Sequence, residues 1–221
     1  MVNACAACLS RQTASSRLEV CVNLAGVIQT TPVQDRATTV PPTALVLASG
    51  RGERFLASGG RTHKLQALLG GKPVLQWVLD AIKASGLPLH VEAAGHPGIG
   101  DSIAAAVRAT PHANGWLIVL GDLPLLQGTT LQVIAQALQN HEVVVPAYQG
   151  QRGHPVAFSA QCRDALLALQ GDQGAAAVVR AFGAFELPVS DIGIVTDVDT
   201  MAALQVAEAL LQQRKACSNS Q

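Results

Sequence analysis

Along most of the chain, short apolar runs alternate with longer segments that carry an apolar residue every three or four positions. The short runs predict buried strands, and the longer segments predict helices with one apolar face. The predicted strands are Ala44–Ala48, Leu87–Ala93, Trp116–Leu120, Glu142–Ala147, Pro155–Phe158, Phe185–Val189 and Gly193–Asp197. The predicted helices are Pro73–Ser85, Asp101–Ala109, Thr130–Gln139, Gln161–Gln170, Gly174–Phe182 and Met201–Lys215.

This order of elements predicts an α/β fold. Strands that alternate with helices of this length form a mostly parallel sheet with helices on both faces, which gives three layers. We therefore expect one Rossmann-like domain over residues 44–215, followed by a flexible tail at 216–221. No internal repeat or linker interrupts the sequence after residue 43.

The first 43 residues differ from the rest because they show no convincing helical or strand period. They end in a run that contains Pro41 and Pro42, and prolines of this kind interrupt regular structure. The segment predicts a disordered N-terminal extension, 1–43. A targeting peptide is the alternative, but the segment lacks a strong apolar stretch and contains Glu19 and Asp35.

Charge and cysteine content narrow the classes of partner. The chain has 221 residues, with 15 Lys and Arg against 15 Asp and Glu, so no broad basic face for nucleic acid is expected. No apolar run approaches about 18 residues, so no membrane span is expected. The five cysteines are an odd number, which does not suggest a set of disulfides. The Cys5-x-x-Cys8 pair is not accompanied by a second C-x-x-C or a histidine pair, which a structural metal site would need. This pattern is typical of reduced thiols in a cytoplasmic protein.

A glycine-rich segment, Ser49–Gly60, follows the first predicted strand. Gly50 and Gly52 let the backbone approach an anion closely, and Arg54 and Lys64 can neutralise phosphate oxygens. The segment is not a Walker A loop. It is not a dinucleotide fingerprint either, because Phe55 replaces the last glycine and a long loop is predicted where a helix should begin. Taken alone, the segment is either a phosphate loop or a plain turn.

Acidic residues follow two further predicted strands. In open α/β sheets, ligands bind outside the carboxyl ends of the strands, which is where Asp122, Asp197 and Asp199 are predicted. Asp197 and Asp199 point to the same side if the chain there is extended. Three carboxylates without a compensating Lys or Arg beside them favour a divalent cation such as Mg²⁺. The alternative is that Asp122 or Asp199 caps the following helix.

Together these motifs resemble the MobA-like nucleotidyltransferase family, and within it the molybdenum cofactor cytidylyltransferases. The matching segments occur in the family's order and span residues 43–213. They are Leu47-Ala48-Ser49-Gly50-x-Gly52-x-Arg54-Phe55, Lys64-Leu65, Leu69–Leu75, Gly121–Pro124, Gly153–Val156, Gly171–Gly174 and Asp197–Thr200.

The resemblance implies Mg²⁺-dependent transfer of CMP from CTP to the terminal phosphate of molybdopterin, with release of pyrophosphate. It implies catalytic roles for Arg54, Lys64 and Asp122, and a metal site at Asp122, Asp197 and Asp199. The implied nucleotide-binding residues are Leu47, Ala48, Ser49, Gly50, Gly52, Arg54, Lys64 and Ser102. The implied acceptor-binding residues are Gly153, His154 and Pro155.

Several alternatives remain open at this point. The same fold can use another NTP or acceptor, such as GTP with molybdopterin or a sugar phosphate, or the chain can be a non-catalytic nucleotide-binding accessory protein. A molybdoenzyme or its maturation chaperone is a further candidate partner. The other histidines show no ligand spacing and are predicted to be structural or solvent-facing: His63, His90, His96, His112 and His141.

Two departures from the family pattern carry expectations of their own. The segment from Leu87 to Gly100 is shorter than usual, which predicts fewer strands and a more open acceptor pocket. Ala176 stands where the family often has an arginine, and Arg180, one turn further on, is the predicted replacement.

Overall fold

The computed structural model describes residues 18–22, 28–32 and 40–218, and the chain forms two compact units, Met1–Thr39 and Val40–Gln221. In the first unit, β1 (Leu18–Val22) pairs antiparallel with β2 (Ile28–Pro32). These strands differ from the disorder predicted for 1–43, and the alternating Leu-Glu-Val-Cys-Val run is the local signal for one of them. The remainder of 1–39 lies outside the described residues, so its disorder stays a prediction.

The second unit is built on a seven-stranded sheet with the order β11-β8-β10-β7-β3-β6, and β9 pairs with β8 at one side. Its strands are β3 (Thr43–Leu47), β6 (Leu89–Glu92), β7 (Gly115–Leu120), β8 (Val143–Tyr148), β9 (Gln151–Arg152), β10 (Val156–Ser159) and β11 (Phe185–Pro188). β3 runs parallel to β6 and β7, and β11 runs parallel to β8. β10 is antiparallel to both β7 and β8. The mostly parallel sheet predicted from the sequence is thus confirmed.

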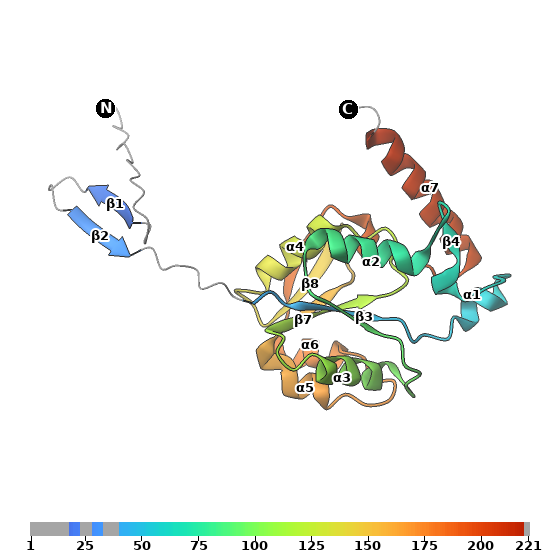
Figure 1. Ribbon diagram of the computed structural model, residues 1–221, viewed down its shortest axis with the longest axis horizontal. Coiled ribbons are helices and arrows are strands. Elements are labelled where there is room, and N and C mark those ends of the chain that lie inside the picture. The colour runs from blue at the N-terminus through green and yellow to red at the C-terminus, as the bar shows by residue number, and fades with distance from the viewer. Residues whose placement is uncertain (1–17, 23–27, 33–39, 219–221) are drawn as a thin grey trace. The chain divides into compact units, whose positions relative to one another are not determined.

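Helices cover both faces of this sheet (Figure 1). The helices are α1 (Glu53–Ala57), α2 (Val74–Ser85), α3 (Ile99–Ala109), α4 (Gly128–Ala137), α5 (Arg163–Leu167), α6 (Ala176–Phe182) and α7 (Met201–Ser218). α2 and α4 lie over one face, and α3, α5 and α6 lie over the other. The shorter elements are η1 (Lys64–Gln66), β4 (Leu68–Leu69), β5 (Lys72–Pro73), η2 (Ala160–Cys162) and η3 (Ile192–Val195).

The central strands are apolar throughout because both of their faces are buried. In β3, Ala44 and Val46 pack into the core beneath α2 and α4, while Leu45 and Leu47 pack into the core on the α3 side. A strand buried on both faces reads as a continuous apolar run, which is why it is recognisable in the sequence. α2 is recognisable for a different reason, because its buried stripe ends at Gly86, a left-handed residue with φ 75°.

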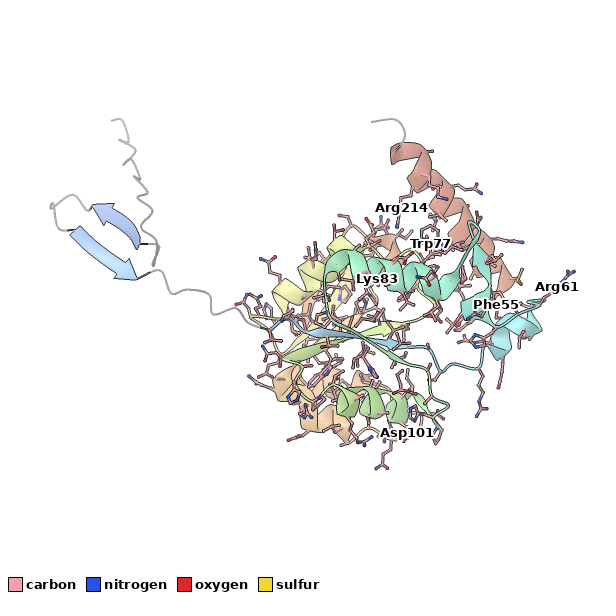
Figure 2. The ribbon with its side chains drawn as sticks, viewed as in Figure 1. Phe55, Arg61, Trp77, Lys83, Asp101 and Arg214 are labelled. Carbon is pink, nitrogen blue, oxygen red and sulfur yellow. The ribbon has the colours of Figure 1, made fainter. Side chains whose placement is uncertain are left out.

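A third apolar cluster lies at the end of the domain where α1 and α7 meet. Phe55 of α1, Leu65 of η1, Val198 and Leu211 of α7 are buried together there. Figure 2 labels Phe55 in this region and Trp77 on the neighbouring α2. The cluster anchors the loops on either side of the sheet's carboxyl edge, which is where the predicted site residues lie.

The segment Gly193–Asp197, predicted as a strand, is a 3-10 turn, η3, followed by coil. Ile194 is buried and Val195 partly buried in the core on the α2 side, but the segment does not pair with any strand of the sheet in the described residues. The Asp191 carboxylate accepts the N–H of Gly193, and a Cβ at Gly193 would lie 2.2 Å from the Leu125 carbonyl oxygen. The strand prediction was therefore wrong, because a tertiary contact determines this conformation.

Three other boundaries also differ from the prediction. A short helix, α1, forms within the long loop predicted after Gly52. The predicted helix Gln161–Gln170 is reduced to η2 and the short α5. α7 continues to Ser218, into the predicted tail 216–221.

β6 forms one edge of the sheet, and its outward side has no partner strand among the described residues. Leu89 and Val91 on this strand are exposed. Within the described part of the chain, no helix is both long and apolar enough to cross a membrane.

Candidate active site

A cavity of about 470 Å³ opens at the carboxyl ends of β3 and β7. This volume lies in the range of small-molecule sites. Its lining residues are Leu47, Ser49, Gly50, Arg51, Arg54, Lys64, Leu65, His96, Pro97, Gly98, Ile99, Ser102, Leu120, Gly121, Asp122, Asp197 and Asp199. Most of the residues predicted to bind nucleotide or metal are thus brought together at one place.

Two of the predicted nucleotide-binding residues, Ala48 and Gly52, are not among the residues that line this cavity. Gly52 lies outside this cavity but lines an adjoining hollow together with Gly50 and Arg54. Ala48 lines neither hollow and instead packs against the cluster around Phe55. The prediction of Ala48 as a direct ligand contact therefore has no support from its position.

Lys64 joins the two acidic segments of the cavity. Its Nζ is 2.5 Å from Asp122 Oδ2 and 2.5 Å from Asp199 Oδ1. Arg54 Nη2 is 2.5 Å from the other Asp199 oxygen, Oδ2. The side chains of Lys64, Asp122 and Asp199 are 13%, 12% and 19% exposed, so these charges interact with little screening by water.

The protonated form of Lys64 is favoured in this setting. Burial lowers the pKa of Lys64, but the charges of Asp122 and Asp199 and their hydrogen bonds raise it by more, so the pKa lies above its ordinary value. The side chain therefore stays cationic throughout the physiological pH range.

This pairing corrects the expectation that the three carboxylates lack a compensating cation. Lys64 and Arg54 supply two positive charges, although both are far from Asp122 and Asp199 in the sequence. In the described residues, no group of three or more His, Cys, Asp or Glu side chains is arranged to hold a metal ion. Asp197 lines the cavity, but only Asp122 and Asp199 converge on one point.

Two features of the acids nevertheless fit a divalent cation. The Asp122 and Asp199 oxygens that contact Lys64 share one nitrogen at 2.5 Å, so they lie within about 5 Å of one another. The second Asp122 oxygen, Oδ1, is buried and has no hydrogen-bond partner among the described residues. Proteins usually bind Mg²⁺ through one or two carboxylates, and the phosphates of the substrate supply further ligands.

Backbone hydrogen bonds hold the acidic segments in register. The N–H of Val198 donates to the Asp122 carbonyl oxygen at 2.9 Å, and Val198 itself is fully buried. The N–H of Gly121 donates to the Leu47 carbonyl oxygen at 3.1 Å. The backbone around Asp122 is thereby fixed to the end of β3 on one side and to the Asp197–Asp199 segment on the other.

The predicted acceptor residues Gly153, His154 and Pro155 do not line the cavity. The N–H of His154 donates to the Ile194 carbonyl oxygen at 2.9 Å, so this segment lies against η3, just before Asp197. Burial lowers the pKa of His154 below its ordinary value, and the charges of Asp122 and Asp197 offset this only in part. Arg180, the predicted replacement for the family's arginine, is exposed on α6 and is not among the lining residues.

Part of the cavity lining, at Ser49, Gly98 and Ser102, carries no charged side chain. Ser49 Oγ and Ser102 Oγ are 3.0 Å apart, and Ser102 also donates to the Gly98 carbonyl oxygen. Gly98 packs so closely against Gly171 that a Cβ would lie 2.1 Å from the Gly171 carbonyl carbon. The Asp101 carboxylate accepts the Gly171 N–H at 2.9 Å (Asp101 is labelled on α3 in Figure 2). This wall therefore has little freedom to move.

His96 is a lining residue that the sequence analysis predicted to be structural or solvent-facing. Its Nε2 lies 3.2 Å from Glu92 Oε1, and the Glu92 carboxylate also accepts the Ala94 N–H at 3.0 Å. The residues from His96 to Ile99 follow the end of β6. The same strand-end rule that identified Asp122 could have indicated them.

The surroundings of Glu92 predict how the stability of the fold depends on pH. Burial raises the pKa of Glu92, but the Ala94 N–H and the neighbouring His96 and His90 lower it by more, so the folded-state pKa lies below the ordinary value. The stability that this carboxylate contributes is present above about pH 4.5 and is lost as the pH falls through the folded-state pKa. We expect the difference in free energy of unfolding between wild type and Glu92→Gln to shrink between about pH 5 and pH 3.

Denaturant titrations at several pH values measure this difference. A matched variant, Glu186→Gln, removes an exposed carboxylate paired with Arg152, and it should show a smaller change. A gap for Glu92→Gln that stays constant or widens in acid would contradict the assignment.

A buried parallel sheet with a glycine turn, two cations and paired acids at its carboxyl edge is typical of proteins that bind a nucleoside triphosphate. A family model described as MobA-like NTP transferase domain matches residues 80–187. This match agrees with the resemblance to the MobA-like nucleotidyltransferases that the motifs indicated. The matched range includes Asp122 and Gly153–Pro155 but not the glycine turn or Asp199.

Solved structures share the fold of this chain. Rv0371c from Mycobacterium tuberculosis H37Rv is 25% identical, with a TM-score of 0.65, over 78% of this chain and 99% of that one. A structure of the same protein in complex with manganese has a TM-score of 0.62 at 24% identity, over 76% and 98% of the two chains. Molybdopterin-guanine dinucleotide biosynthesis protein A from Archaeoglobus fulgidus shares the fold, with 17% identity, a TM-score of 0.58 and coverage of 77% and 99%.

A curated relative extends the comparison to a longer protein. The bifunctional protein GlmU of Zymomonas mobilis is 28% identical over 127 residues, which is 46% of this chain and 28% of the relative. The chain therefore matches only about a quarter of that relative's length.

Proposed function

We propose that the protein transfers CMP from CTP to the terminal phosphate of a molybdopterin-type acceptor and releases pyrophosphate. The observation that carries nucleotidyl transfer is Lys64, held between Asp122 and Asp199 beside the Gly50–Gly52 turn in a cavity of nucleotide size. The choice of CTP and molybdopterin is supported by the ordered motifs, which resemble the cytidylyltransferase subgroup.

The residues of the cavity suit this chemistry. An oxygen of the acceptor phosphate forms a bond to the α-phosphorus of CTP, and the bond from that phosphorus to the leaving pyrophosphate breaks. A phosphate monoester has a second pKa of about 6, so the acceptor is largely ionised at neutral pH and needs no strong base. It needs orientation and positive charge, and Arg54 and Lys64 supply the charge from one side of the cavity.

Asp122 and Asp199 are the residues that would hold a divalent cation, which we propose to be Mg²⁺. When bound, such an ion neutralises phosphate charge and fixes the triphosphate oxygens. Asp197 lines the same cavity and is proposed as the third carboxylate near the ion. With a cation held by these acids, the ammonium of Lys64 would be available to contact the triphosphate.

The remaining subsites follow from position. We propose that the triphosphate lies along Gly50, Gly52 and Arg54, and that the nucleoside lies at the uncharged part of the lining near Ser49 and Ser102. Gly153, His154 and Pro155 are proposed on the acceptor side because the His154–Ile194 hydrogen bond holds them against η3, which leads into the Asp197–Asp199 segment.

Pyrophosphate release with each of the four NTPs, with and without molybdopterin and Mg²⁺, tests the proposal. We expect CTP with molybdopterin to give the highest kcat/KM, and release to depend on the acceptor. A preference for GTP would contradict the cytidylyl assignment, and activity only with a sugar phosphate would contradict the acceptor. Saturable NTP binding without release for any acceptor would instead indicate the accessory protein.

A further inference from the structure

His63 connects the glycine turn to the segment that carries Lys64. Its Nε2 is 2.6 Å from the Gly50 carbonyl oxygen, and its Nδ1 is 3.3 Å from the backbone nitrogen of Leu65. A carbonyl oxygen only accepts and a backbone N–H only donates, so this geometry corresponds to a neutral ring with its proton on Nε2. The ring therefore donates to one segment and accepts from the other.

Packing brings the same ring against the turn a second time. Gly52 has φ +67°, and a Cβ at this position would lie 3.3 Å from both Cδ2 and Nε2 of His63 and 3.6 Å from Lys64 Cγ. A side chain at Gly52 would crowd the His63 ring, so the glycine allows the ring to pack directly against the turn. His63 thus contacts both glycines that border the proposed triphosphate position.

The hydrogen bond to Gly50 also fixes the direction of a donor. In a trans peptide the C=O and the following N–H point in opposite directions, so holding the Gly50 carbonyl directs the Arg51 N–H away from the His63 ring. Within the described residues, the N–H groups of Gly50, Arg51 and Gly52 make no hydrogen bond to another protein group. These donors are available to an anion.

We propose that His63 is a positioning residue for triphosphate binding, which orients the Gly50–Gly52 turn relative to Lys64. The proposal rests on the proposed function, since it concerns how that cavity receives its phosphates. His63 does not line the cavity and acts only through the backbone of the turn and the placement of Lys64. From the sequence, His63 was predicted to be structural or solvent-facing.

A purely structural role makes a different prediction. His63 is the N-cap of η1 through its bond from Leu65, and a capping role needs only that bond. Two substitutions separate the bonds. His63→Asn retains a side-chain oxygen that can accept the Leu65 N–H, as asparagine does at N-caps, but it is too short to reach Gly50. His63→Gln retains an amide donor near the position of Nε2.

The test uses the full-length protein, with CTP and inorganic tripolyphosphate as probes, each with Mg²⁺. For His63→Asn, we expect the dissociation constant of both probes and the KM for CTP to rise about tenfold, with kcat changed less than about threefold and the melting temperature unchanged. For His63→Gln, we expect recovery of tripolyphosphate affinity to within about threefold of wild type. Equal effects on both probes place the loss at the phosphates and not at the base.

The outcomes discriminate between this inference and the proposed function. If His63→Asn binds tripolyphosphate as tightly as wild type, or if His63→Gln is weakened as much as His63→Asn, the positioning role is wrong while the proposed function stands. A fall in the melting temperature of His63→Asn that accounts for its weaker binding also overturns the positioning role. If wild-type protein binds neither CTP nor tripolyphosphate, the proposed function fails and this inference fails with it.

Discussion

Replacing Asp122 with asparagine is expected to reduce kcat for pyrophosphate release by about 100-fold or more. The substitution keeps the shape of the side chain but removes the negative charge that pairs with Lys64 and would bind the cation. It also converts the buried Oδ1, which has no partner among the described residues, into part of a neutral amide. Initial rates at saturating CTP, with circular dichroism to verify folding, measure the effect.

A matched control lies on α2. Asp80 Oδ2 pairs with Lys72 at 2.7 Å, which is the same type of ion pair, but at an exposed position outside the cavity. Asp80→Asn should leave turnover within about twofold of wild type, since exposed ion pairs contribute little. Turnover by Asp122→Asn comparable to that of Asp80→Asn would contradict the role of Asp122.

Replacing Lys64 with methionine is expected to abolish turnover and also to lower the free energy of unfolding by about 2–3 kcal/mol. Without the ammonium, Asp122 and Asp199 face each other across a site where both are largely buried. A divalent cation can replace the lost charge, so millimolar MgCl₂ or MnCl₂ should raise the melting temperature of this variant more than that of wild type. Thermal melts with and without the salts measure this.

Two comparisons isolate the cause. The double variant Lys64→Met with Asp199→Asn removes the repulsion, so it should regain stability and lose the response to cations. Potassium chloride at matched ionic strength accounts for general screening. A Lys64→Met protein as stable as wild type, with no specific response to Mg²⁺ or Mn²⁺, would show that Asp122 and Asp199 do not form a cation site.

The sequence predicts those elements whose buried positions follow a simple regular pattern. β3 is apolar on both faces and α2 has a regular stripe with a glycine after its last turn, so both were placed within about one residue. η3 could not be predicted in this way. Its short apolar run has the pattern of a strand, and its conformation depends on Asp191 and on a close approach to Leu125, far away in the chain.

The candidate site was partly predictable for a related reason. The strand-end rule gathered Ser49 and Asp122, because parallel strands bring their carboxyl ends to one edge. Asp199 was predicted at the same edge from a strand that is η3 and coil in the structure. The rule says nothing of which charges pair. Lys64 lies 58 residues from Asp122 and 135 from Asp199, so its contact with both acids appears only in the fold. The same holds for His63, whose partner Gly50 is 13 residues away.

We propose that a triphosphate on the Gly50–Gly52 turn meets a divalent cation at Asp122 and Asp199. A crystal structure with a non-hydrolysable CTP analogue and Mn²⁺ tests it most directly, since anomalous scattering locates the ion. We expect the manganese between these two carboxylates and in contact with phosphate oxygens, with Lys64 turned toward the triphosphate. Nucleotide bound elsewhere, or manganese remote from Asp122, would contradict the account.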